Sequence, residues 1–247
     1  MRMPIRAIFA ATLALTAVSC TDDAPPKPAS GGADPSAARA PQAGGMIEVV
    51  VKYLGQPVVE TLEINKDVGA CGTDKQLQKF AVGPDHGLRD AVVALAGWKG
   101  EPTVRTGPRP TLDQKRCEFH PRVLAMMPGE LDILNSDGIL HNIHTSSQAN
   151  APINKAQPRF RKVITESFDE PERIRVRCDV HSWMEGWIVV LPHPYFGVTD
   201  YSGGTKIQNV PPGKHTIEVW YPALGSHRRE VAVKDGQTST VTFEIKG

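Results

Sequence analysis

Short apolar runs with the spacing of β-strands recur from residue 46 to the end of the chain. They lie at residues 46–53, 58–64, 91–95, 123–127, 131–135 and 186–191. Glycine and proline fall between many of these runs and mark turns. Only residues 74–80 have a faint helical pattern. Regularly spaced short strands joined by such turns predict an all-β fold, either a sandwich or a barrel.

The first 20 residues have the pattern of an export signal. A charged start is followed by an apolar run over residues 7–18, and a small residue precedes Cys20. This run is too short for a good membrane span. Residues 17–20 also resemble a lipobox, in which Cys20 would be lipidated. We therefore expect a protein of the periplasm or cell envelope, anchored to the membrane through Cys20, with plain cleavage and release to the periplasm as the alternative.

The composition after the signal is that of a linker followed by ordinary globular sequence. Residues 21–45 are rich in Ala, Pro, Gly and Ser and predict a disordered linker. The remaining residues, 46–247, suffice for one large or two small domains. The net charge is +1, with 6% aromatic and 22% charged residues, so nothing predicts a nucleic-acid partner.

Residue types that bind metals cluster in the second half of the chain. Cys178, His181 and Met184 follow one another at intervals of three residues, so one tight loop can present all three to a single ion. His141 closes the strand-like run at 131–137 and can supply a second imidazole from a neighbouring strand. One thiolate, two imidazoles and a weak thioether are the donor set of a mononuclear blue-copper site.

Other interpretations of these residues exist. A structural zinc site could use His141, His144, Cys178 and His181, because zinc accepts the same nitrogen and sulfur donors. It would leave Met184 without a role. Taken singly, the cysteine could belong to a disulfide, His181 could be a surface residue and Met184 could fill the core.

The two motifs also resemble those of a known family. In order, composition and spacing, Leu140-His-Asn-Ile-His144 and Cys178-Asp-Val-His-Ser-Trp-Met184 are similar to the copper-binding motifs of the amicyanin and plastocyanin-like cupredoxins. The resemblance covers residues 123–191. It implies a Greek-key β-sandwich with one type 1 copper ion that carries single electrons.

The resemblance assigns roles to individual residues. His141, Cys178 and His181 match the three strong ligands, and Met184 matches the axial one. Asn142 matches the residue that ties the two ligand loops together by hydrogen bonds.

Three further expectations come from the same motifs. His144 resembles a motif histidine that is not a ligand. Asp179 stands where the family has Ser or Thr, and a carboxylate beside the thiolate would favour Cu(II) and lower the reduction potential. The exposed edge of His181 would be the electron port, with Ile139, Leu140 and Trp183 nearby as a docking surface.

The remaining cysteines, Cys71 and Cys117, form a pair if Cys20 is lipidated and Cys178 binds metal. Export places them in an oxidising compartment, where a disulfide is expected. It would close a loop of about 46 residues and stabilise the fold by about 4 kcal/mol in the chain-entropy model. A bridge involving Cys178, or a reduced and buried pair, is the alternative.

Residues 193–247 resemble the carboxypeptidase regulatory-like, transthyretin-like β-sandwich. The matching features are a Val198-Thr-Asp turn, a Val210-Pro-Pro-Gly hairpin and a closing strand at 240–245. The resemblance implies an interaction or spacer module, sometimes linked to carbohydrate. About four strands are few for a sandwich of roughly seven. We therefore expect a cupredoxin-like domain at 46–192, a module at 193–247, and pairing of residues 46–64 with that module.

The sequence as a whole predicts an exported electron carrier that exchanges electrons with an unidentified redox protein. Enzyme activity is not expected, because copper enzymes of the nitrite-reducing kind need three more histidines and the leftover histidines form no such motif. A copper store or chaperone is one alternative. A structural or carbohydrate-binding envelope module is another, and its glycan contact would use residues such as Tyr195, Phe196, Trp220 and Tyr221.

Overall fold

The computed structural model describes residues 44–100 and 107–247. The predicted export signal, Cys20 and nearly all of the predicted linker lie outside these residues. Strands dominate the described part, whose two helical segments are the single turn α1 (Val68–Cys71) and the 3₁₀ turn η1 (Pro84–His86). Neither is long or apolar enough to cross a membrane. The predicted all-β fold is confirmed.

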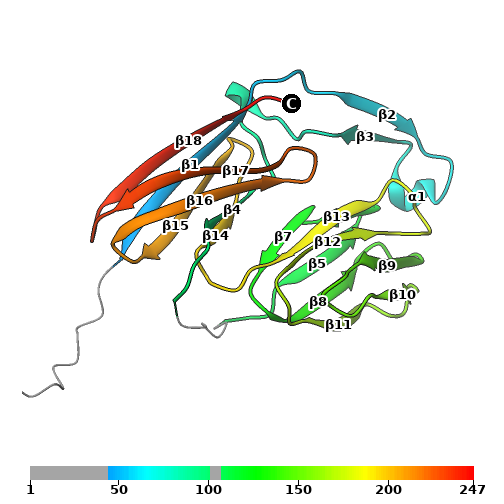
Figure 1. The fold of residues 1–247 in the computed structure, drawn as a ribbon. Coiled ribbons are helices and arrows are strands. Elements are labelled where there is room, and N and C mark those ends of the chain that lie inside the picture. Colours follow the sequence, from blue (N-terminus) through cyan, green and yellow to red (C-terminus); the bar gives the residue numbers. More distant parts are fainter. Residues whose placement is uncertain (1–43, 101–106) are drawn as a thin grey trace, which may run out of the picture. The chain divides into compact units, whose positions relative to one another are not determined.

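One group of strands, the support sandwich, forms two sheets with the orders β15-β1-β18 and β14-β4-β16-β17 (Figure 1). Its strands are β1 (Gly45–Tyr53), β4 (Val92–Ala96), β14 (Phe196–Val198), β15 (Gly204–Val210), β16 (Gly213–Tyr221), β17 (Gly225–Val233) and β18 (Thr238–Ile245). Burial alternates along β1, so Ile47, Val49 and Val51 face the interior. They share one apolar core with Ile217 of β16 and Phe243 of β18.

A second group, the inserted sandwich, forms sheets with the orders β10-β9-β12-β13-β7 and β11-β8-β5-β6. Its strands are β5 (Thr111–Lys115), β6 (Glu118–His120), β7 (Val123–Met126), β8 (Gly129–Asn135), β9 (His141–Ser146), β10 (Asn154–Gln157), β11 (Val163–Phe168), β12 (Glu172–Arg177) and β13 (Glu185–Val190). Ile133, Ile143 and Ile188 from both of its sheets are fully buried in one core.

The two sandwiches are interleaved in the sequence. β1 pairs with β15 and β18, and β4 pairs with β14 and β16, so strands of the support sandwich flank the inserted one on both sides in the chain. The predicted domain boundary between residues 192 and 193 is wrong for β4. This strand lies before the boundary in the sequence but pairs with strands that follow it. The five C-terminal strands alone would leave unpaired strand edges and exposed apolar surface. β1 pairs between β15 and β18, and β4 pairs between β14 and β16, so these edges are hydrogen-bonded.

A separate two-stranded sheet lies outside both sandwiches. This hairpin, residues 59–78, consists of β2 (Val59–Glu63), α1 and β3 (Asp74–Gln78), and its strands pair with each other. The faint helical pattern at 74–80 is therefore a wrong prediction. In β3 Lys75 is buried and Leu77 half-buried while the neighbours are exposed, which is the period of a strand.

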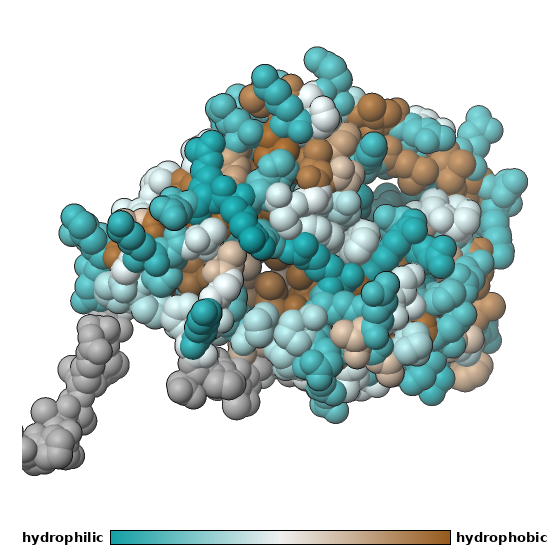
Figure 2. All heavy atoms as spheres, viewed as in Figure 1, coloured by the Kyte–Doolittle hydropathy of each residue, from teal (hydrophilic) through white to brown (hydrophobic). Residues whose placement is uncertain are grey.

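Side chains of the two sandwiches meet in a small apolar cluster that contains Val92, Val123, Val189 and Trp220. The Arg173 guanidinium lies over the Trp220 ring, 5.1 Å from its centroid. Elsewhere the face in Figure 2 mixes hydrophobic and hydrophilic residues.

Candidate metal centre

The residues of the predicted copper motif lie on a loop between two paired strands. β12 and β13 are antiparallel neighbours, and residues 178–184 connect them. The loop closes on itself, because the Cys178 N–H donates to the Met184 carbonyl at 3.3 Å and the Met184 N–H donates to the His181 carbonyl at 3.0 Å. His141 is the first residue of β9, which pairs with β12, so the sheet brings it to the loop.

Three donor atoms converge at this point. The Nδ1 atoms of His141 and His181 lie 3.0 Å apart, and each is 3.8 Å from the Cys178 Sγ. All three side chains are buried, with 0% exposure for both histidines and 2% for Cys178. Among the described residues, Cys178 is the cysteine that forms no disulfide.

Each imidazole contacts a carboxylate through its Nε2 atom, the ring nitrogen that is not part of the donor cluster. The Asp137 Oδ2 is 2.9 Å from the His141 Nε2, and the Asp67 Oδ2 is 3.0 Å from the His181 Nε2. An ionised carboxylate can only accept hydrogen bonds, so the network assigns the proton to Nε2 in both rings. The Nδ1 lone pairs of both rings then point at one another and at the Cys178 sulfur.

This arrangement fits a soft metal ion. Two unprotonated nitrogens at 3.0 Å repel each other unless a proton or a metal ion lies between them, and a metal ion can contact both nitrogens and the sulfur at once. Bonds of about 2.0 Å to nitrogen and 2.3 Å to sulfur allow donors up to about 4.3 Å apart, which covers all three distances. Burial lowers the pKa of His141, with an opposing contribution from the Asp137 hydrogen bond, and favours the neutral ring that a metal requires.

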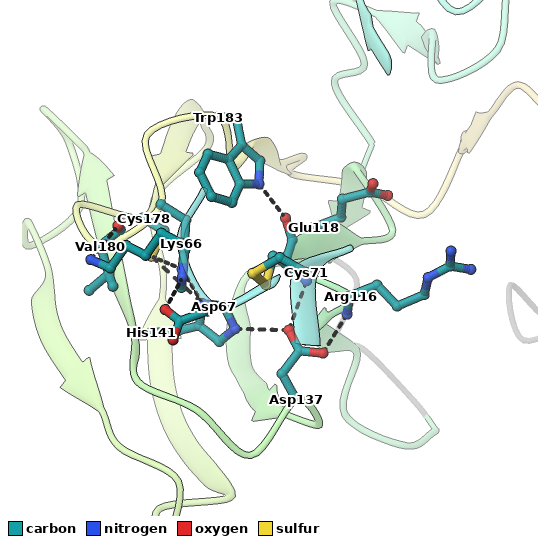
Figure 3. Close-up of a disulfide and its surroundings, with 12 residues drawn as sticks. Lys66, Asp67, Cys71, Arg116, Glu118, Asp137, His141, Cys178, Val180 and Trp183 are labelled. Carbon is teal, nitrogen blue, oxygen red and sulfur yellow. Dashed lines mark hydrogen bonds and ion pairs between the residues drawn. A yellow bond between two sulfur atoms is a disulfide. The ribbon is translucent and has the colours of Figure 1, made fainter. Parts of the chain in front are cut away.

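Asp137 is itself fixed in place. Its carboxylate also accepts the Cys117 N–H at 2.8 Å and the Arg116 N–H. Arg116 and Cys117 both have a φ of 55°, so the turn between β5 and β6 aims two consecutive N–H groups at Asp137 (Figure 3). The orientation of His141 thus depends on a turn some 25 residues earlier in the chain.

Met184 is buried at 1% exposure in the same apolar cluster as Cys178. Its backbone closes the ligand loop, as described above. The structure therefore places Met184 at the end of the loop, in the interior, and its axial role remains a prediction.

Asn142 joins the two ligand segments. Its Oδ1 accepts the Asp179 N–H at 2.5 Å, and its Nδ2 donates to the Asp179 Oδ2 at 3.0 Å. His144 also contacts Asp179, with its Nδ1 2.9 Å from Oδ2. The Asp179 carboxylate thus bonds to β9 side chains, and these hydrogen bonds, led by that of His144, lower its pKa. The predicted effect of Asp179 on the thiolate is not supported by any contact between the two groups.

The predicted zinc set is not assembled in the described part of the chain. His141, Cys178 and His181 form one donor cluster, but His144 belongs to none of the clusters found there. His144 is instead partly exposed and bonded to Asp179.

The prediction that an edge of His181 is exposed is wrong. His181 is completely buried, and the hairpin 59–78 supplies the residues that cover its Nε2 edge. The Trp183 ring lies beside it at a tilt of 53°, with ring centroids 5.1 Å apart. Leu140 is 48% exposed, so one residue of the expected docking surface does reach solvent.

Asp67 and Asp137 contact the two candidate histidine ligands, and the sequence interpretation missed both. Asp137 lies four residues before His141, a spacing that could have drawn attention to it. Asp67 lies 114 residues before His181 and carries no local signal. The predicted disulfide between Cys71 and Cys117 is confirmed, with a Cα–Cα distance of 5.0 Å.

The aromatic residues proposed for a glycan contact do not form an exposed face. Trp220 is 7% and Tyr221 1% exposed, and both pack inside the protein. The Tyr221 hydroxyl accepts the Ala81 N–H at 3.0 Å. Tyr195 and Phe196 are half-buried.

Comparison with known proteins adds a distant likeness. Neither a protein-family model nor a curated protein matches the sequence. The Cu-containing nitrite reductase NirK from Thermus scotoductus SA-01 matches at 18% identity and a TM-score of 0.32, over 37% of this chain and 25% of its own. A reduced Cu(I) form of an amicyanin mutant matches at 16% identity and a TM-score of 0.31, over 40% of this chain and 98% of its own. Likenesses of this degree carry no argument about chemistry, so the case for a metal rests on the donor atoms.

Proposed function

We propose that this chain is an exported copper protein that carries single electrons. His141, Cys178 and His181 hold one type 1 copper ion, and Met184 is its weak axial ligand. The observation that supports this best is the convergence of the Nδ1 atoms of His141 and His181 and the Cys178 sulfur within 3.8 Å of one another. The copper ion would supply a one-electron couple between Cu(II) and Cu(I).

The chain's own residues keep the donors still. Asp137 and Asp67 fix the two rings, and Asn142 ties β9 to the ligand loop. The strands on both sides of the loop are hydrogen-bonded to each other. Little ligand movement is then needed when the charge of the centre changes, which favours rapid electron transfer.

Burial of the whole donor set supports a carrier over a copper chaperone. A chaperone must release its metal to a partner, whereas His141, Cys178 and His181 are enclosed at 2% exposure or less. In our proposal the protein is exported and anchored through Cys20 to the cell envelope, where a redox protein of unknown identity is its partner.

A redox titration of the copper-loaded full chain tests the proposal. We expect one copper ion per chain by metal analysis, and a visible absorption band that disappears and returns with one electron per copper. Binding of zinc in preference to copper, or a bound copper that cannot be reduced and reoxidised reversibly, would contradict the carrier function.

A further inference from the structure

The hairpin 59–78 lies against the candidate metal centre and is tied to it at several points. The Lys66 Nζ donates to the Val180 carbonyl at 3.1 Å, and Asp67 contacts His181. The Lys75 Nζ donates to the Arg116 carbonyl and pairs with Glu118 at 3.0 Å. These ties connect the hairpin to both the ligand loop and the β5–β6 turn.

The side chain of Asp67 contacts His181 and does not cap the helix. Asp67 is the N-cap residue of α1, a position where aspartate normally accepts a hydrogen bond from the helix, yet its side chain makes no such bond. Its backbone is in the left-handed region, with a φ of 50°, which is costly for a residue other than glycine. The missing cap bond and the left-handed backbone are both explained if Asp67 is oriented to accept a hydrogen bond from the His181 ring.

The disulfide fixes the turn that carries Asp67. The Asp67 carbonyl accepts the N–H groups of Ala70 and Cys71, so one turn of helix connects Asp67 to Cys71. Cys71 is bonded to Cys117, and both sulfurs lie within 4.8 Å of a ring nitrogen of His181. Figure 3 shows the disulfide among Asp67, Trp183 and the residues of the centre.

Trp183 also contacts the His181 ring. The tilted Trp183 ring packs against it, and the Trp183 Nε1 donates to the Cys117 carbonyl at 3.1 Å. Ile64 and Cys71 of the hairpin extend the apolar core that contains Cys178. The hairpin therefore completes the wall around the donor atoms.

We propose that Asp67 is a positioning residue for His181 and that the hairpin 59–78 is a disulfide-locked cap that seals the metal centre. This inference rests on the proposed copper site. Asp67 holds the Nε2 proton so that Nδ1 faces the metal, and its negative charge stabilises the more positive Cu(II) state. The disulfide keeps the cap closed over the donors.

Two measurements on the full chain separate these roles. The first is the rate at which iodoacetamide alkylates Cys178 in the metal-free protein, followed by mass spectrometry of the peptide that contains it. The second is the reduction potential of the copper-loaded protein. Asp67→Asn, Asp67→Ala and the double variant Cys71→Ser/Cys117→Ser are compared with Asp85→Asn. Asp85 is a matched control, because it is an exposed aspartate with the same φ of 50°.

We expect the double variant to alkylate at least about tenfold faster than the unaltered protein, because local opening of the cap no longer has to overcome a covalent bond. Asp67→Ala, with its disulfide intact, should give a smaller rise. Asp67→Asn retains an acceptor for the Nε2 proton but not the charge, so its reduction potential should rise while its alkylation stays slow. Asp85→Asn should change neither measurement.

Equal alkylation rates in all variants would overturn the cap. A reduction potential that stays unchanged in Asp67→Asn would overturn the effect of the charge, and one that stays unchanged in Asp67→Ala as well would overturn the positioning role. If the double variant is unfolded by circular dichroism, Asp67→Ala decides the first question. The alkylation rates need no metal, so they test the cap even where copper fails to bind, which would contradict the proposed function instead.

Discussion

The interiors of the two sandwiches differ in kind. The support sandwich is filled by apolar and aromatic side chains such as Ile47, Tyr53 and Phe243. The inserted sandwich has an apolar core of similar size, but beside it lies a group of buried polar residues. These are Gln114, Asn135, His141, Asn142, Thr145, Asn150, Gln157 and His181. Buried polar groups are costly unless paired, and most of those in the described residues lie in the inserted sandwich.

The polar residues around His141 form a connected network. The Gln114 Nε2 donates to the Gln157 Oε1 at 2.7 Å, and the Gln157 Nε2 donates to the Ile133 carbonyl at 3.0 Å. The Asn135 Nδ2 donates to the carbonyls of Ile139 and Gln157, both at 2.8 Å. Gln157 is also the strand partner of His141. The network thus holds the segment just before His141 and the strand that pairs with it.

The largest expected effect comes from the disulfide that locks the hairpin to the inserted sandwich. In Cys71→Ser/Cys117→Ser we expect a loss of about 4 kcal/mol in the free energy of unfolding, because the unfolded chain regains the freedom of a 46-residue loop. Chemical denaturation measures it. A loss below about 1 kcal/mol would show that the hairpin is held by its non-covalent ties.

A change in the polar network sharpens the comparison. Gln157→Leu removes an acceptor from Gln114 and leaves buried groups unpaired, which should cost about 1–3 kcal/mol. Thr199→Val is the matched change in the support sandwich, where the Thr199 hydroxyl donates to the Leu88 carbonyl and accepts the Ala91 N–H. We expect similar losses of stability but a lower copper affinity in Gln157→Leu alone. Equal copper affinity in the two variants would mean that the network does not support the centre.

The apolar cores should respond alike. Ile143→Val and Ile207→Val each remove one methyl group from a residue that is at most 1% exposed, so each should lower the free energy of unfolding by about 1 kcal/mol. Thermal or chemical denaturation checks this. A much larger loss of unfolding free energy for Ile143→Val would show that the packing of β9 in the core is coupled to the polar network.

The smallest expected effect concerns acid stability. Burial alone would raise the pKa of Glu172, but hydrogen bonds from Asn150 and the Gln148 backbone outweigh it and hold that pKa below its usual value of 4.5. The ionised form is therefore favoured by folding. Its stabilising contribution is complete above the pKa of the unfolded chain and is lost as the pH falls through the lower folded value.

Glu172→Gln should accordingly flatten the decline of unfolding free energy below about pH 4.5. Denaturation curves at several pH values measure this slope. Glu218→Gln is the counterpart in the support sandwich, since hydrogen bonds and charge from Arg228 and Arg173 outweigh burial and lower the pKa of Glu218 as well. A slope that neither variant changes would assign acid sensitivity to other groups.

The parts of the candidate site that lie close together in sequence could be predicted. The spacing of Cys178, His181 and Met184 determines which side chains one loop can present, and the structure brings the first two together with His141. The disulfide could be predicted by elimination once the other cysteines had roles. Strand periodicity predicted β1, because alternation along a strand is local. The low strand count of the C-terminal segment predicted that residues 46–64 pair with it, which is confirmed for β1 but not for β2.

What depends on contacts between distant segments could not be predicted. Asp67 contacts the buried His181, and nothing near either residue in the sequence indicates the other. β4 joins strands more than a hundred residues later, and its apolar run would suit either sandwich. Residues 74–78 were misread because a short polar strand that pairs only with β2 lacks a clear apolar period.

The visible absorption spectrum of the full chain with Cu(II), measured beside Cys178→Ser, tests the central claim most directly. We predict an intense band near the red end of the spectrum that is absent from the variant, because only a thiolate bound to copper gives this charge transfer. A copper-loaded protein without the band, or a band that survives in Cys178→Ser, would contradict a copper centre built on His141, Cys178 and His181.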